Sequence, residues 1–377
     1  MKILFISNIT NEITNFAIPS IYASKNLGIE FHHAANWSNV SEDMRKKEEE
    51  KYGIKIHNID FERNPFRLRN YKAYKQLLNL MKGNSFDVVH CNTPIGGILG
   101  RICAKQSGVS KVIYTAHGFH FYEGAPKINN TVYKAVERIL GKLTDTIITM
   151  NTEDYNAAKN FKLRNNGKVY YVPGVGVNSN EYQLNSLDKS KLRGKLGLKD
   201  DDIVLITIGE LINRKNHETS IKSIYKSKNN KIKLLICGEG SQKDELIKLV
   251  KELGLEDRIY FLGFRTDIKE LLNISDIFIF PSYQEGLPRA MMEAMSSGLP
   301  CIASSIRGNV DLINNEKGGY LHHPNDVDAF ANSINIISSN KELRTNMKKI
   351  NLQNIGKFDI ENIKSIINKI YKEELML

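Results

Sequence analysis

Two carboxylates, Glu285 and Glu293, stand eight positions apart where the chain changes from strand to helix. A short apolar run, 276–280, predicts a buried strand that ends before a loop carrying Glu285 and Gly286. A helix is predicted next, because Pro288 suits a first helical turn, where a backbone N–H would have no partner. The second carboxylate therefore lies on the helix, and the first lies just before it.

A strand-to-helix turn of this kind suits a ligand that carries both phosphate and hydroxyl groups. Its free backbone N–H groups and the positive end of the helix point at one spot, which favours phosphate. Glu285 and Glu293 are themselves negative, so we expect them to accept hydrogen bonds from hydroxyl groups rather than to bind phosphate. A nucleotide sugar has both kinds of group.

A pair of cations follows another predicted strand, 203–208. The turn glycine Gly209 comes first, and Arg214 and Lys215 follow within the same turn region. Fixed cations beside a pyrophosphate leaving group would stabilise the negative charge that develops as its bond to a sugar breaks. The alternative is an Arg–Lys pair on an ordinary solvated turn.

Two more turns after strands carry candidate ligand contacts. The turn after the predicted strand 233–237 contains Gly238 and Gly240, which would let the backbone approach a ligand closely. The turn after the next strand contains Phe264 and Arg265. Neither turn by itself identifies a ligand site. The order of the two turns and their spacing relative to Glu285 make them candidates.

An aromatic and histidine-rich segment, 114–126, follows a predicted strand in the first half of the chain. It reads YTAHGFHFYEGAP and contains His117. Aromatic side chains exposed after a strand are costly unless they meet a ligand, so the segment is a candidate binding loop. The alternative is a packed aromatic loop with a histidine in the core.

The chain alternates short apolar strands with helical patterns twice over, which predicts two α/β units with parallel sheets. The predicted strands are 2–7, 31–35, 55–59, 88–91, 111–115, 146–150, 169–172, 203–208, 233–237, 259–262, 276–280 and 300–303. The predicted helices are 18–26, 71–81, 97–106, 133–143, 217–227, 242–253, 266–274, 288–297, 326–338 and 360–374. The Pro- and Gly-containing segment 172–180 reads as a linker, so we expect domains at 1–177 and 178–358.

Length and composition describe an ordinary globular protein of two domains. The chain has 377 residues, of which 41% are hydrophobic and 25% are charged. No apolar run approaches the ~20 residues that a membrane span needs, and the first residues are interpreted as a buried strand rather than a signal peptide. Cys91, Cys103, Cys237 and Cys301 are scattered, so we expect reduced core cysteines, a cytosolic location, and neither a disulfide nor a metal site.

The net charge of +11 raises the question of an anionic partner. Most lysines are dispersed, which argues against nucleic-acid binding. The segment 65–82 is denser, with several basic residues, no acidic ones, and Phe66, Tyr71 and Tyr74 among them. It could lie on an anionic membrane surface, or it could be a solvated helix that packs its leucines inward.

The segment FPSYQEGLPRAMMEAMSSGLP resembles the donor-site motif of the family-4 retaining glycosyltransferases, and the resemblance extends over nearly the whole chain. It implies that Glu285 contacts the transferred sugar and that Glu293 contacts the ribose. The backbone of Gly286, Leu287 and Pro288 would then meet the phosphates or the sugar.

The other motifs match the same family with one departure. The resemblance places Lys215 at the position of the family's lysine after Gly209, whereas Glu210 stands where an arginine is usual. Arg214 is the candidate for the second cation, and which role each cation takes stays open. The resemblance also places the backbone near Phe264 and Arg265 around the nucleobase.

The segment around His117 is similar to the acceptor side of bacterial surface-polysaccharide enzymes of this family. The resemblance implies the GT-B fold, with two Rossmann-like domains facing across a cleft. The N-terminal domain would bind the acceptor and the C-terminal domain the donor, and the helix 359–377 would pack back on the first domain. By the same resemblance, His117 lies beside the reacting sugar, where it would hydrogen-bond either donor hydroxyls or the acceptor.

The function implied is a retaining, metal-independent glycosyltransferase that needs no cofactor. It would move a sugar from a nucleotide-diphosphate sugar, with UDP the expected nucleotide, to a lipid-linked or oligosaccharide acceptor at the inner face of the membrane. A GT-B sugar-nucleotide hydrolase or epimerase is the alternative. A Rossmann oxidoreductase is excluded, because ISNITNE after the first strand contains no glycine. A purely non-enzymatic binder would leave Glu285, Glu293 and His117 unexplained.

Overall fold

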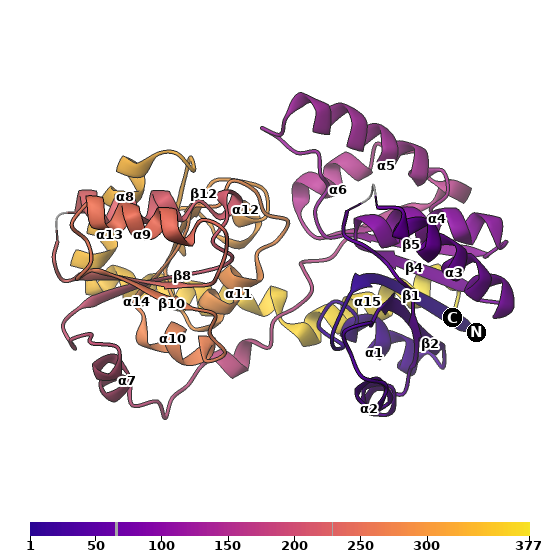
Figure 1. The fold of residues 1–377 in the computed structure, drawn as a ribbon, viewed down its shortest axis with the longest axis horizontal. Coiled ribbons are helices and arrows are strands. Elements are labelled where there is room, and N and C mark those ends of the chain that lie inside the picture. The colour runs from indigo at the N-terminus through magenta and orange to yellow at the C-terminus, as the bar shows by residue number, and fades with distance from the viewer. Residues whose placement is uncertain (65–66, 228) are drawn as a thin grey trace. The chain divides into compact units, whose positions relative to one another are not determined.

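The computed structural model describes residues 1–64, 67–227 and 229–377, and the chain forms two compact units (Figure 1). The N-terminal unit combines Met1–Gly176 with Ile360–Leu377, and the C-terminal unit is Val177–Asp359. Each unit contains one parallel sheet with helices on its faces. The prediction of two α/β units with parallel sheets is confirmed.

The N-terminal sheet has the strand order β3-β2-β1-β4-β5-β6-β7, and all its neighbouring strands are parallel. Its strands are β1 (Lys2–Ile9), β2 (Glu30–Asn36), β3 (Lys55–Asn58), β4 (Val88–Asn92), β5 (Lys111–Ala116), β6 (Thr146–Thr149) and β7 (Lys168–Tyr171). Its helices are α1 (Ile18–Asn26), α2 (Glu42–Tyr52), α3 (Arg69–Gly83), α4 (Pro94–Gln106), α5 (Lys134–Gly141), α6 (Thr152–Ala158) and α15 (Ile360–Glu374).

The C-terminal sheet has the order β10-β9-β8-β11-β12-β13, again with parallel neighbours. Its strands are β8 (Ile203–Ile208), β9 (Ile232–Cys237), β10 (Ile259–Gly263), β11 (Ile277–Phe280), β12 (Cys301–Ser304) and β13 (Gly319–His322). Its helices are α7 (Lys189–Lys195), α8 (His217–Ser227), α9 (Lys243–Glu252), α10 (Ile268–Ile274), α11 (Arg289–Ser296), α12 (Asn309–Leu312), α13 (Val327–Ser339) and α14 (Lys341–Asn354).

The central strands are buried on both faces, which explains why they read as continuous apolar runs. In β1, Leu4 and Ile6 pack in the cluster that contains Leu77 of α3. Ile3 and Phe5 point to the other face, where they pack in the cluster that contains Ile363 of α15. Alternation along a single strand therefore supplies two separate cores, one on each side of the sheet.

Helices α2, α6, α7, α12 and α14 and strand β13 lie outside the predicted elements. The physical reason is weak apolar periodicity. Helix α2 buries none of its residues, and α14 buries only Met347 and Asn351. Strand β13 has four residues, of which only Gly319 is fully buried, so its sequence is typical of a loop. Only its pairing with β12 in the structure identifies it as a strand.

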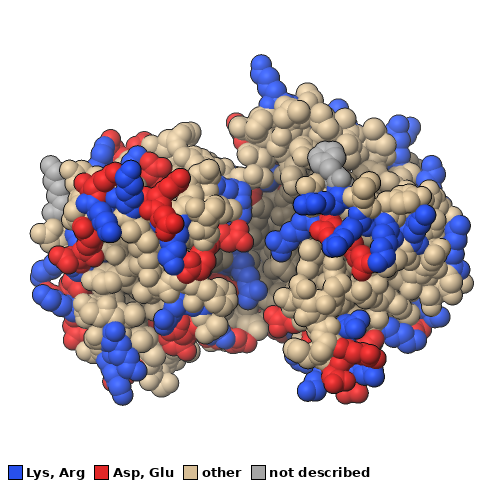
Figure 2. All heavy atoms as spheres, in the orientation of Figure 1, with Lys and Arg blue, Asp and Glu red and all other residues tan. Residues whose placement is uncertain are grey.

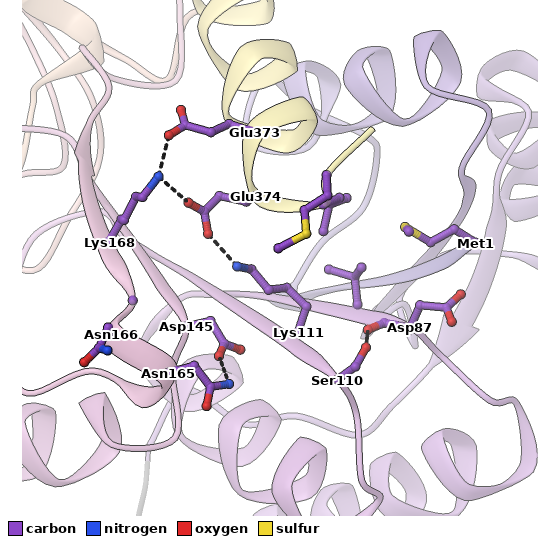
Figure 3. Close-up of a pocket in the computed structure, with 14 residues that line it drawn as sticks. Met1, Asp87, Ser110, Lys111, Asp145, Asn165, Asn166, Lys168, Glu373 and Glu374 are labelled. Atoms are coloured by element: carbon purple, nitrogen blue, oxygen red, sulfur yellow. Dashed lines mark hydrogen bonds and ion pairs between the residues drawn. The ribbon is translucent and has the colours of Figure 1, made fainter.

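Helix α15 packs beside α1 on the N-terminal sheet (Figure 1). Its end is fixed by Glu374, which is buried and accepts hydrogen bonds from Lys111 Nζ at 2.5 Å, Thr146 Oγ1 at 2.5 Å and Tyr170 Oη at 2.7 Å. Figure 3 shows Glu374 facing Lys111 beside a cavity of 520 Å³ at the amino edge of the sheet. The neighbouring Glu373 points instead to the half-exposed Lys168, at 2.6 Å.

We expect Glu374→Ala to destabilise the N-terminal unit by about 3 kcal/mol or more, because removing one partner of a buried ion pair leaves the other partner unpaired. Glu373→Ala is the matched control, since its ion pair is exposed and is worth less than about 1 kcal/mol. Urea denaturation of both variants measures the difference. Equal losses of stability would show that Glu374 does not anchor α15.

Candidate active site

The two carboxylates lie on a strand, loop and helix at the carboxyl edge of the C-terminal sheet. Strand β11 is fully buried, the loop after it carries Glu285, and Glu293 lies on α11. Pro288 precedes the first helical residue, as the sequence pattern indicates. Each of the two glutamates is only 9% exposed, so a ligand would meet them in a largely dehydrated environment.

Glu285 is shared by two cations from the turn after β8. Lys215 Nζ donates to Glu285 Oε1 at 2.8 Å, and Arg214 Nη1 donates to the same oxygen at 3.2 Å. Arg214 also binds the backbone oxygen of Gln284 at 2.7 Å. Lys215 Nζ lies 4.8 Å from the centroid of the Phe280 ring, which adds a cation–π contact. The structure thus brings together three of the predicted catalytic residues.

Glu293 is held by a residue that the sequence analysis missed. Arg289, one helical turn earlier, donates from Nε to Glu293 Oε1 at 2.8 Å. The buried Tyr182 lies close to both Glu293 and Arg289. Burial, together with the Glu293 carboxylate, raises the pKa of Tyr182, so its hydroxyl stays protonated. Tyr182 lies in the turn Ser179–Tyr182 just after the linker, and no local pattern marks it.

The turns after β8 and β9 contact each other, which is the reason for the two glycines of the β9 turn. A Cβ atom at Gly238 would lie 1.9 Å from the backbone oxygen of Gly209, and one at Gly240 would lie 2.4 Å from that of Leu211. Neither position has room for a side chain. The close approach seen here is that of one turn to another, and the predicted approach of these glycines to a ligand stays a prediction.

The loop of Glu285 is supported from behind by the turn after β12. The buried Arg307 donates from Nε to the backbone oxygen of Glu285 at 3.1 Å. At Gly308, with φ of 81°, a Cβ atom would lie 2.3 Å from the backbone oxygen of Gly286. Arg307 thus fixes the backbone that carries the carboxylate, a role that sequence spacing does not reveal.

Phe264 and Arg265 follow β10, at the same edge of the sheet. The Phe264 side chain is 80% exposed, which is unusual for a large aromatic residue and leaves it available to a planar ligand. Arg265 forms an ion pair with Asp267, with 2.8 Å between Nε and Oδ1. Of this pair, Phe264 therefore offers a side-chain surface, whereas Arg265 is engaged within its own turn.

His117 lies at the carboxyl edge of the N-terminal sheet, after β5. Its Nε2 is 3.0 Å from Asn92 Oδ1, its Nδ1 is 3.1 Å from Met150 Sδ, and its ring contacts Phe16 edge-on, with 4.8 Å between centroids. Burial lowers the pKa of His117 to about 4, so the imidazole is neutral at pH 7. Asn92 Oδ1 and the Met150 thioether can both only accept, so the single ring proton serves one of them, and we place it on Nε2, facing the stronger acceptor Asn92 Oδ1.

The aromatic residues after His117 divide between core and surface. Phe119 and Phe121 are buried and stack on each other with 4.7 Å between centroids. They belong to the core cluster of the N-terminal unit. For these two residues the packed aromatic loop, the alternative stated above, is the correct description.

The basic segment 65–82 forms α3 in its second part, and Pro65 and Phe66 lie outside the described residues. Leu77 and Met81 are buried in the core, whereas Tyr71 is exposed. Figure 2 shows basic side chains beside acidic ones on the visible face of the N-terminal unit. The ion pairs formed by α3 include Arg69 with Glu62 and Lys72 with Asp60.

The described part of the chain offers neither a metal cluster nor a helix suited to cross a membrane. Residues 1–64, 67–227 and 229–377 contain no group of three His, Cys, Asp or Glu side chains placed to hold a metal ion. Over the same ranges, none of the helices combines the length and apolarity that crossing a bilayer requires. The four cysteines are buried, as predicted for core residues, and each is a free thiol in the structure.

Two family models match the chain, one in each unit. The model described as Glycosyl transferases group 1 matches residues 188–353, which include Lys215, Glu285 and Glu293. The model described as Glycosyl transferase 4-like matches residues 35–151, which include His117.

Similar proteins agree with these matches. A Bacillus subtilis (strain 168) protein named as a glycosyltransferase, EpsD, is 35% identical over 347 residues, 91% of this chain and 88% of the relative. An Escherichia coli protein, named UDP-Gal:alpha-D-GlcNAc-diphosphoundecaprenol alpha-1,3-galactosyltransferase, is 33% identical over 315 residues, 82% of this chain and 81% of the relative.

The fold has a counterpart of known structure. The crystal structure of Anabaena Alr3699/HepE in complex with UDP superposes with a TM-score of 0.79 at 20% identity, covering 99% of this chain and 100% of the other. The two parallel-sheet units are those of the GT-B architecture, as predicted. With both units matched and relatives aligned along most of its length, the chain belongs to the group 1 glycosyltransferases.

Proposed function

We propose that this glycosyltransferase moves a sugar from a UDP-linked donor to a sugar carried on a lipid diphosphate, with retention of configuration. The observation that carries the proposal is the cluster of Glu285, Lys215 and Arg214. It places a carboxylate, which can accept hydrogen bonds from sugar hydroxyls, beside two cations. The Escherichia coli relative is named for a UDP-galactose donor and a diphosphoundecaprenol-linked acceptor, and the Anabaena structure contains UDP. Neither name refers to hydrolysis or epimerisation.

The ion cluster provides the charges that the reaction needs. In the structure, the Glu285 carboxylate balances Lys215 and Arg214. A donor pyrophosphate is a stronger anion, so both cations would turn to it, and Glu285 would accept hydrogen bonds from the sugar hydroxyls. Glu293 would bind the ribose, and the exposed ring of Phe264 would lie near the nucleobase.

Bond making and breaking would take place on one face of the sugar. The bond from C1 to the phosphate oxygen breaks, the bond from C1 to the acceptor oxygen forms on the same side, and the acceptor proton passes to the departing phosphate. Lys215 and Arg214 would stabilise the negative charge on that phosphate, which makes a divalent cation unnecessary. His117, neutral and donating to Asn92, would face the reacting sugar from the N-terminal unit.

The basic helix α3 would hold the enzyme at the membrane that contains a lipid-linked acceptor. Its exposed side chains include Tyr71 and Lys75, and the Lys75 ammonium lies 4.5 Å from the centroid of the Tyr71 ring. Basic residues near an anionic surface each contribute about 1 kcal/mol of attraction. The predicted surface also includes Tyr74, and Phe66 from outside the described residues.

Glu293→Ala is expected to weaken UDP binding by roughly 10- to 100-fold, because a hydrogen bond to a charged group is worth about 1.5–3 kcal/mol. Titration calorimetry with UDP and with 2′,3′-dideoxy-UDP tests the assignment, since the variant should bind both alike. Glu285→Ala should reduce turnover more than UDP affinity. Glu252→Ala, an exposed glutamate on α9, is the control. If the Glu293→Ala variant still bound UDP more tightly than 2′,3′-dideoxy-UDP by the wild-type ratio, the ribose contact would be refuted.

Lys215→Ala is expected to lower kcat by ~100-fold or more, the scale of losing one stabiliser of transition-state charge. Arg214→Ala should show a smaller or comparable loss, and Lys222→Ala, on the exposed face of α8, should show none. The measurement is sugar transfer in the presence of a chelator. Activity that the chelator abolishes and a divalent metal restores would contradict the metal-free mechanism.

Binding to vesicles that contain anionic lipid should fall sharply when Arg67, Lys75 and Lys82 become glutamine, and moderate salt should weaken binding of the unaltered enzyme. Co-sedimentation measures both effects. The control carries the same charge change on the C-terminal unit, at Lys226, Lys231 and Lys248. Unchanged sedimentation of the α3 variant would leave this helix as an ordinary solvated surface.

A further inference from the structure

Helix α5 and the helical turn that leads into it, Asn129–Tyr133, present a row of apolar side chains to solvent. An exposed apolar residue recurs every three or four positions along this segment, which places the row on one helical face. The row, called the α5 ridge below, consists of Ile128, Val132, Ala135 and Ile139. Ile128 is 66% exposed and Ile139 is 63% exposed. A contiguous apolar surface of this kind marks a place that another surface covers.

The opposite face of α5 is fixed to the N-terminal unit, so the ridge cannot simply turn inward. Glu137 binds the fully buried Arg101 through both carboxylate oxygens, with 2.8 Å from Nη1 to Oε2 and 3.3 Å from Nη2 to Oε1. The Arg101 guanidinium lies 3.9 Å from the centroid of the Tyr114 ring on β5. Breaking a buried ion pair of this kind is strongly destabilising. The exposure of the ridge is therefore built into the folded unit.

The charged residues around the ridge are almost all basic. Residues 127–142 contain four basic side chains and one acidic side chain, Glu137, whose charge is balanced by Arg101. Three of the four basic residues are exposed, namely Lys127, Arg138 and Lys142. An apolar helical face flanked by exposed cations is typical of helices that lie in the interface of an anionic bilayer. A second copy of the chain would bring the same cations against one another.

The place of α5 in the N-terminal unit suits contact with an extended surface. The helix lies on the outside of this unit, and the visible surface around it is mostly uncharged (Figures 1 and 2). Helix α4 contacts both α3 and α5, so one helix separates the ridge from the basic helix α3. A flat anionic surface could therefore meet both helices.

We infer that the α5 ridge inserts into the headgroup region of an anionic lipid bilayer. Interfacial helices of this kind bury their apolar face by about 5–10 Å, which would place Lys127, Arg138 and Lys142 beside the lipid phosphates. The contribution of α5 is apolar and resists salt, whereas that proposed for α3 is electrostatic and is screened by salt. The inference goes beyond the proposed function, because it depends on neither the donor nor the reaction.

Co-sedimentation of the full chain with phosphatidylglycerol vesicles at about 1 M salt tests the inference, since charges are then screened beyond about 3 Å. The unaltered protein should remain partly bound. A variant with Ile128→Ser, Val132→Ser and Ile139→Ser should partition at least ~10-fold more weakly, because three large apolar side chains no longer leave water. Thermal unfolding measured by circular dichroism should be unchanged. The matched control replaces three exposed apolar residues elsewhere with serine, at Tyr22, Met44 and Ile336.

A fluorescent label at the ridge gives a second, independent measurement. The four natural cysteines are buried, so an environment-sensitive nitrobenzoxadiazole label would react with an introduced Ile139→Cys. On vesicles its emission should shift to shorter wavelength, and spin-labelled acyl chains should quench it. Met44→Cys, on the exposed helix α2 of the same unit, is the control and should show neither effect.

Three outcomes would overturn the inference. The first is equal high-salt binding of the serine variant and the unaltered protein. The second is the same emission and quenching for the labels at positions 139 and 44. The third is a dimer in solution that the serine variant abolishes, which would assign the ridge to a second copy of the chain.

Discussion

The carboxylate of Glu285 is the point on which the C-terminal site depends. It is nearly dehydrated, and a charge in that position is stable only because Lys215 and Arg214 lie against one of its oxygens. The same two cations would be unbalanced without it. The site is therefore assembled around an internal anion that occupies the cations until a ligand with greater negative charge arrives, and the free protein does not leave the largely buried Lys215 without a counter-charge.

This ion cluster requires a rigid frame, and the frame comes from strands that are distant in sequence. Lys215 follows β8 and Glu285 follows β11, and these two strands are neighbours in the sheet. Arg307, after β12, holds the Glu285 backbone from the other side. Parallel order places all these turns at one edge, so the geometry of the site is a consequence of sheet topology.

The parts of the site that sequence predicts are those with a local signature. Glu285 and Glu293 stand out because a strand, a loop and a helix meet within a few residues, and β11 and α11 form there. Tyr182 and Arg307 carry no such signature, because each acts through an approach of chain segments that only the tertiary structure creates. Their contacts with Glu293 and with the Glu285 backbone depend on packing, not on spacing.

The N-terminal unit shows the same limit around His117. This residue is visible in the sequence because it follows a strand in an unusual aromatic segment. Its contacts with Phe16 and Met150 are not visible, because they join segments that are distant in the sequence. The elements that escaped prediction, such as α2 and β13, also lack a buried face of their own, so only tertiary packing defines them.

The position of α15 in the chain also bears on how the protein is made. The side of the N-terminal sheet that presents Ile3 and Phe5 is covered in part by Ile363 and Ile367, which follow the whole C-terminal unit in sequence. During synthesis, that part of the apolar face would stay uncovered while the C-terminal unit, about half of the chain, leaves the ribosome. The C-terminal unit is one continuous segment, so all of its residues are available to fold as soon as that segment has been synthesised. The later unit can therefore finish folding before the earlier one does, and the first-made sheet would need protection from aggregation in the meantime.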